Sequence, residues 1–139
     1  MAAYSKPLPQ LDERTDPDHR AFWEAAKEHR LVMQRCSDCG HIRWPTGPVC
    51  TACLSESWEW HDMSTKGELW SWVNFYQPFH SEWAKDAPYN VSLVKIENGP
   101  IFLTNMVECE DSDLAVGMPV ELIFEDVTGE VAIPKYRPA

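Results

Sequence analysis

The amino-acid sequence predicts a mainly β protein built from three successive parts. We expect an N-terminal arm and helix over residues 1–30, a cysteine-bearing ribbon over residues 31–65 and a five-stranded barrel over residues 66–139. Two Cys-x-x-Cys pairs lie close together in the middle part, and short segments of alternating apolar residues recur after it. With 139 residues and 44% apolar content, the chain can form one ordinary domain or two very small modules that share an interface.

The helix is predicted to begin at Asp16, which can serve as the N-cap, with Pro17 in the first turn. Phe22 and Trp23 contribute to an apolar stripe opposite several charged residues, and the helix should run to about His29. The residues before it are rich in proline and polar side chains. We therefore expect an arm that has no core of its own.

The ribbon is indicated by the spacing Cys-x-x-Cys, ten residues, Cys-x-x-Cys. Two intervening residues let the backbone fold into a knuckle, so that both sulfurs can lie about 2.3 Å from one zinc ion. Gly40 allows the left-handed conformation that such a turn often needs. Alternation near residues 31–33, 42–44 and 58–60 predicts three short strands around the two knuckles.

One pair alone could also be a redox motif, but two pairs at this spacing favour a metal site. The predicted ligands of a single Zn²⁺ ion are Cys36, Cys39, Cys50 and Cys53. Four protein ligands leave no open position for water or substrate, so the zinc should be structural. Such an ion contributes on the order of 10 kcal/mol to the folding of a module with little core.

The last part alternates as β-strands. Strands are predicted at Leu69–Gln77, Tyr89–Ile96, Ile101–Val107, Val120–Phe124 and Val131–Ile133. In the first strand, simple alternation places Leu69, Val73 and Phe75 on one face and Trp70, Trp72 and Tyr76 on the other. Asn98-Gly99 and Thr128-Gly129 mark hairpins. Five short strands in this length suggest a closed or nearly closed barrel, for which the OB-fold is the natural candidate.

The charge distribution disfavours nucleic-acid binding. The net charge is −10, and the barrel half from residue 67 onward carries four basic against twelve acidic residues. Phosphate backbones require clustered Lys and Arg, and no such cluster is present in the sequence. Apolar runs are too short to cross a bilayer, and the first ten residues lack a signal-peptide pattern. We therefore expect a cytoplasmic protein, with no membrane partner, whose thiols remain reduced.

The sequence contains no nucleophile elbow, phosphate-binding glycine loop or pair of metal-binding histidines. Cys109 is interpreted as a small buried or strand-end residue, because no histidine is its neighbour in sequence. His80, in the aromatic loop that precedes the second strand, is the best single candidate for a polar contact. No catalytic residue is predicted in this chain.

The order of these motifs resembles a known family. Its marks are Phe22-Trp23, Gln34-Arg35-Cys36, Pro45, the second cysteine pair and a following tryptophan; weaker matches are Pro88-Tyr89, Leu103-Thr104-Asn105, Gly117-Met118-Pro119-Val120 and Pro134. Together they resemble the zinc-ribbon/OB-fold family long catalogued as a domain of unknown function, over about residues 19–138. Members of that family accompany thiolases and other acyl-CoA enzymes.

This resemblance implies a rubredoxin-like zinc ribbon and a role as an accessory subunit. The implied partner is a thiolase-like enzyme, with a steroid side-chain aldolase or thiolase as the most specific expectation, or a MaoC-like hydratase. A lyase or acyltransferase complex would then require this chain for its assembly and for the CoA-thioester path.

Surplus aromatic residues and several basic residues are candidates for contact with CoA or with the partner. They are Arg35, Arg43, Lys66, Trp72, Phe79 and His80. Two alternatives are a single-stranded nucleic-acid-binding module, since ribbons and OB-folds both serve that purpose, and a free-standing acyl-CoA binder.

Overall fold

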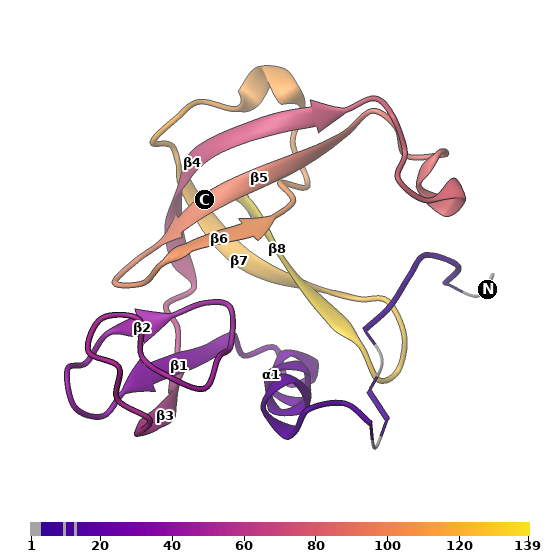
Figure 1. Ribbon diagram of the computed structural model, residues 1–139. Coiled ribbons are helices and arrows are strands. Elements are labelled where there is room, and N and C mark those ends of the chain that lie inside the picture. Colours follow the sequence, from indigo (N-terminus) through magenta and orange to yellow (C-terminus); the bar gives the residue numbers. More distant parts are fainter. Residues whose placement is uncertain (1–3, 10, 13) are drawn as a thin grey trace.

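The computed structural model describes residues 4–9, 11, 12 and 14–139, so part of the predicted N-terminal arm (residues 1–3, 10 and 13) lies outside the described residues. Figure 1 shows one helix and a small ribbon on one side of a curled sheet. The elements are α1 (Pro17–Lys27), β1 (Val32–Cys36), β2 (Ile42–Arg43), β3 (Trp58–Asp62), β4 (Lys66–Phe75), η1 (Ser81–Trp83), β5 (Tyr89–Ile96), β6 (Ile101–Thr104), η2 (Asp111–Asp113), β7 (Pro119–Asp126) and β8 (Ala132–Pro138).

Helix α1 begins where the sequence predicts. The Asp16 carboxylate accepts a hydrogen bond from the backbone N–H of Asp18 at 2.9 Å, and Pro17 occupies the first turn. Phe22 is buried on the face that packs against the rest of the protein. The helix ends at Lys27, and a short connection leads from it to strand β1, which begins at Val32.

The ribbon is a three-stranded antiparallel sheet with the order β2-β1-β3. Strand β1 is its centre and pairs with β2 at Gln34↔Arg43 and with β3 from Val32↔Asp62 to Cys36↔Trp58. Three residues connect β3 to β4, so the ribbon and the barrel are directly adjacent along the chain.

The barrel is a five-stranded antiparallel sheet with the order β6-β5-β4-β7-β8. The sheet curls until its two ends approach each other, and Met106 forms an isolated bridge with Tyr136 of β8. Strand β6 ends at Thr104, earlier than predicted, because the chain from Asn105 onward turns to reach β8. The predicted fold class is confirmed: mainly β, with an N-terminal helix, a zinc ribbon and a curled five-stranded OB-type sheet.

The prediction of which β4 side chains share a face of the sheet is wrong after Leu69. The pairing with β5 shifts register between Leu69 and Ser71, which makes Trp70 the extra residue of a β-bulge. Leu69 therefore lies in the core, whereas Val73 and Phe75 lie on the opposite, outer face of the sheet. A bulge reverses the side-chain alternation after it, and simple periodicity cannot anticipate that reversal.

One continuous core joins the helix, the ribbon and the barrel. It contains Phe22, Ala25, Leu31, Val32, Met33, Met63, Leu69, Val94, Ile96, Phe102, Met106, Leu114, Val120 and Tyr136. Trp44 of the ribbon connects the parts, since its ring lies 4.6 Å from that of Phe22 and 5.4 Å from that of Phe102 between centroids. No helix in the described part of the chain is both long and apolar enough to cross a membrane.

Candidate metal centre and interaction surfaces

The four predicted ligand cysteines converge at one end of the ribbon. Their sulfur atoms all lie within 4.8 Å of one another, with Sγ–Sγ distances of 3.6 Å for Cys36–Cys53 and for Cys39–Cys50. Four sulfurs around zinc at its usual bond length form a tetrahedron with edges of about 3.8 Å. The donor set and its spacing therefore fit a structural Zn²⁺ ion, as the sequence predicts.

The two knuckles have the same backbone design. In the first, the N–H of Gly40 donates to the carbonyl of Cys36 at 3.0 Å; in the second, the N–H of Leu54 donates to the carbonyl of Cys50 at 2.9 Å. Both donors adopt a left-handed backbone, with φ of 78° at Gly40 and 64° at Leu54. The glycine was predictable, whereas Leu54 holds the same conformation without the freedom of a glycine.

The thiols favour a bound cation. The backbone N–H of Cys39 lowers the pKa of the Cys36 thiol to about 6, which promotes the thiolate. At Cys53 the backbone N–H of Ser55 lowers the pKa, but hydrogen bonds with the other sulfurs outweigh it and raise the pKa to about 12. Four sulfurs this close cannot all ionise without a cation between them, and Zn²⁺ supplies that charge.

Arg43 lies inside the ribbon rather than on its surface. Its side chain is 4% exposed, donates from Nη2 to the carbonyl of Gly47 at 2.9 Å and places its guanidinium over the ring of Trp58. Buried Gln34, its neighbour across the sheet, accepts from the N–H of Gly47 at 2.8 Å. These two side chains fix the loop that follows β2. The role of Gln34 was missed, although its position two residues before Cys36 places both on one strand face.

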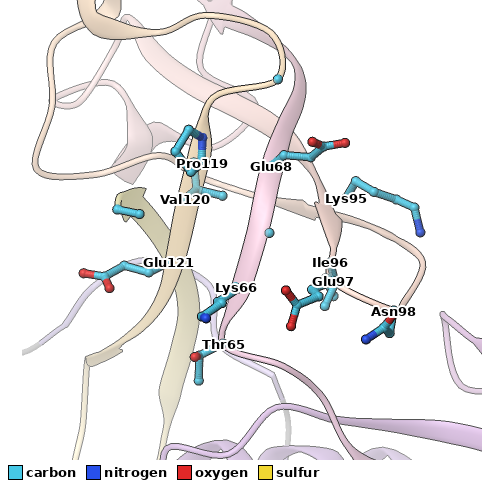
Figure 2. Close-up of a pocket in the computed structure, with 13 residues that line it drawn as sticks. Thr65, Lys66, Glu68, Lys95, Ile96, Glu97, Asn98, Pro119, Val120 and Glu121 are labelled. Carbon is cyan, nitrogen blue, oxygen red and sulfur yellow. The ribbon is translucent and has the colours of Figure 1, made fainter.

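The other predicted basic contacts lie apart from each other. Arg35 is exposed, and its guanidinium lies 3.9 Å from the position of a Cβ on Gly40, beside the first knuckle. Lys66 lines a groove of about 640 Å³ where β4 lies between β5 and β7. Figure 2 shows two lysines and three glutamates around this groove: Lys66, Lys95, Glu68, Glu97 and Glu121. The acidic majority does not favour a phosphate there.

The aromatic candidates separate into core and surface. Trp72 packs against the core, since it pairs with buried Ser92 on the inner face of the sheet. Phe79 is 79% exposed at the end of the long β4–β5 hairpin, which Figure 1 shows extending away from the ribbon. His80 caps η1, where its Nδ1 accepts from the N–H of Glu82 at 3.2 Å. Contact of these residues with CoA or a partner stays a prediction.

A surface that the sequence did not reveal lies on the outer side of β4, β5 and β6. Antiparallel register places seven apolar side chains on this outer apolar face: Val73, Phe75, Tyr89, Val91, Leu93, Ile101 and Leu103. Val73 is 57%, Leu103 61% and Ile101 39% exposed, while the other four are half-buried. Large contiguous apolar patches on a folded protein mark interaction sites, so this face is a candidate for one. Locating the bulge in β4 would have been needed to find it.

The fold and the cysteine site define a class of protein, a zinc ribbon joined to an OB-fold. Family models identify the family within this class. The rubredoxin-like zinc ribbon domain of ChsH2 matches residues 23–59, and the C-terminal OB-fold domain of ChsH2 matches residues 60–125. The chain belongs to the DUF35 family, with domains of the ChsH2 type.

Several relatives support this membership. A DUF35 domain-containing scaffold protein of Pyrococcus furiosus is 31% identical over 76% of this chain and 77% of that protein. A probable enoyl-CoA hydratase alpha subunit of Thermomonospora curvata is 38% identical over 86% of this chain, but the match spans only 37% of that longer protein. Among solved structures, a chain of the Ltp2-ChsH2(DUF35) aldolase superposes with a TM-score of 0.79 and 33% identity, covering 91% of this chain and 98% of that chain.

Proposed function

We propose that this chain is a non-catalytic accessory subunit that binds a thiolase-like acyl-CoA enzyme of the steroid side-chain aldolase type. In this role it supports assembly of the complex and the path of the CoA thioester. The outer apolar face carries the proposal, because a partner that covers it would remove Val73 and Leu103 from water. Similarity to almost the whole length of a chain in the Ltp2-ChsH2(DUF35) aldolase supports the same role.

The metal centre contributes indirectly. Its four cysteine ligands leave no position for substrate, so the zinc stabilises the ribbon and takes no part in the reaction. Trp44 then joins the ribbon to Phe102 on the core side of β6, the edge strand of the sheet that carries the outer apolar face. We infer that the ribbon supports the surface that the partner contacts.

A matched pair of valine variants tests the proposal. Tagged wild-type chain, Val73→Asp and Val116→Asp are each purified from the native host, and the co-purified proteins are identified by mass spectrometry. Val116 is 72% exposed in the loop before β7, outside the outer apolar face. Wild type and Val116→Asp should retain a thiolase-fold subunit in stoichiometric amount, and Val73→Asp should lose it. Recovery of no acyl-CoA enzyme by any of the three contradicts the proposal.

A hydratase-fold partner is the second candidate, favoured by the relative that is named as a hydratase alpha subunit. The same purification distinguishes it, because the recovered subunit would then be hydratase-like. Calorimetry with CoA thioesters should give weak binding to the isolated chain; tight binding would favour a free-standing acyl-CoA binder. Salt-sensitive anisotropy changes with single-stranded oligonucleotides would favour the nucleic-acid alternative.

A further inference from the structure

Strand β6 has one unoccupied edge. Among the residues that the structure describes, it pairs with β5 only, at Ser92↔Thr104, Leu93↔Leu103, Val94↔Phe102 and Lys95↔Ile101. The N–H of Ile96 donates to the carbonyl of Pro100 at 3.1 Å, which identifies Ile96 and Pro100 as a hydrogen-bonded pair of the ladder. Hydrogen-bonded pairs alternate in an antiparallel ladder, so the backbone groups of Ile101 and Leu103 point away from β5.

The closure of the barrel does not use these groups. It begins one residue later, where Thr104 Oγ1 donates to the carbonyl of Pro134 at 3.1 Å. The N–H of Tyr136 then donates to the carbonyl of Asn105, and the N–H of Val107 donates to the carbonyl of Tyr136. Within the described part of the chain, no other segment donates to or accepts from the backbone of Ile101 and Leu103.

An apolar groove of about 450 Å³ lies at the Leu103 end of this edge. Its walls come from α1, the ribbon, η1, β5, β6 and β8, and include Trp23, Trp44, Trp83, Val91, Leu103 and Pro134. Figure 1 shows α1 and the ribbon on the side of β6 that faces away from β5. The groove therefore combines apolar walls with the outward N–H and carbonyl of Leu103, and those of Ile101 lie two residues further along the same edge.

This combination selects one kind of occupant. An acyl chain would fill the apolar walls but leave the backbone groups of Ile101 and Leu103 without partners. A second folded copy would have to bring its own sheet edge into a groove that α1 and the ribbon flank. A single extended peptide can do both, since its backbone pairs with β6 and its alternate side chains enter the groove.

We propose that the free edge of β6 receives an extended segment of the partner subunit as an added β-strand. The inference rests on the proposed function for the identity of the partner. The added strand would continue the outer apolar face, to which Val91 and Leu103 already belong. The partner would then contact the sheet in two ways, by covering its outer face and by extending its edge.

Two substitutions at one position separate backbone pairing from side-chain packing. Leu103→Pro removes the outward N–H but none of the bonds to β5, and edge strands tolerate proline at such positions. Leu103→Ala removes the side chain and keeps the N–H. With the co-purified acyl-CoA enzyme subunit, Leu103→Pro should weaken binding by about tenfold or more and Leu103→Ala by only about threefold. Equal effects of both variants overturn the strand addition.

Hydrogen exchange of the wild-type chain gives a readout that does not depend on folding of the proline variant. The amides of Ile101 and Leu103 should exchange rapidly in the free chain, while that of Phe102, which pairs with Val94, is protected. In the complex, the Ile101 and Leu103 amides should slow by about 100-fold. A complex that leaves them unprotected overturns the strand addition while the proposed function stands. Protection in the free chain that grows with concentration also overturns it, because a second copy then occupies the edge.

If no acyl-CoA enzyme is recovered, the proposed function fails and the strand addition is tested with a displayed library of random twelve-residue linear peptides. Binders that are retained by Leu103→Ala and lost by Leu103→Pro support it. Absence of any enriched peptide overturns it.

Discussion

Removing a single oxygen atom from the barrel core should stabilise the protein. Tyr136 lies in the middle of β8, is fully buried, and its hydroxyl has no hydrogen-bond partner within the described residues. A buried hydroxyl without a partner costs about 1–3 kcal/mol, so Tyr136→Phe should raise the free energy of unfolding by about 1–2 kcal/mol. For a chain of this length, that gain corresponds to a rise in Tm of about 3–7 °C.

The same residue makes stability depend on alkaline pH. Burial raises the pKa of Tyr136 above its usual value near 10, so the folded chain holds the phenol proton more tightly than the unfolded chain does. Its contribution is fully present below pH 10 and is lost above it, by about 1.4 kcal/mol per pH unit. Tyr136→Phe should lose less stability between pH 10 and 11 than wild type.

Thermal and urea unfolding at pH 7.5, 10 and 11 measure both effects. Tyr76→Phe serves as the control, because the Tyr76 side chain is 75% exposed and its hydroxyl can bond to water. A Tm of Tyr136→Phe at or below that of wild type would refute the reasoning, since it would mean that the hydroxyl is satisfied in solution. An unchanged alkaline slope would refute the titration argument alone.

Three further predictions concern the ribbon and the sheet. Chelation of zinc, or Cys53→Ser, should unfold the ribbon and expose its tryptophans, because a structural zinc contributes about 10 kcal/mol or more and the free energy of unfolding of the whole protein is of about the same size. Metal analysis should give one zinc per wild-type chain, and Cys109→Ser should keep that zinc. Leu54→Gly should raise Tm by about 3 °C, because it relieves about 1 kcal/mol of left-handed strain at a side chain that is 76% exposed; an unchanged or lower Tm would count against this. Gly67→Ala should lower the free energy of unfolding by about 1–3 kcal/mol in urea titrations, because its Cβ would lie 2.8 Å from a backbone oxygen of β5, whereas Gly129→Ala, with open space around it, should change little.

The metal centre was predictable because its chemistry lies in local sequence. Two residues between cysteines determine a knuckle, and the short gap between the pairs brings the knuckles together. A turn near Asn98-Gly99 was predictable for the same reason, but its central residues are Glu97 and Asn98, because the N–H of Gly99 donates to the carbonyl of Ile96, and of these two only Asn98, with a φ of 56°, is left-handed. These features depend on few residues that are close in the chain.

The outer apolar face was not predictable, because it depends on register between strands. The bulge at Trp70 moves Val73 and Phe75 to the outer face, and it arises from pairing with β5 rather than from a local motif. Arg43 was predicted to contact CoA or the partner, and its burial was not anticipated because arginine is rarely buried. The structure shows that the carbonyl of Gly47 and the ring of Trp58 offer it an interior position.

The bulge at Trp70 also bears on how this surface can change during evolution. Both faces of the hairpin formed by β4 and β5 carry large apolar side chains, so either set is compatible with a core. Deleting one residue near Trp70 would exchange the two sets, bringing Val73 inward and sending Trp72 outward. A change in chain length, more than any single substitution, would therefore exchange the side chains that the outer apolar face presents while leaving the cysteine site untouched.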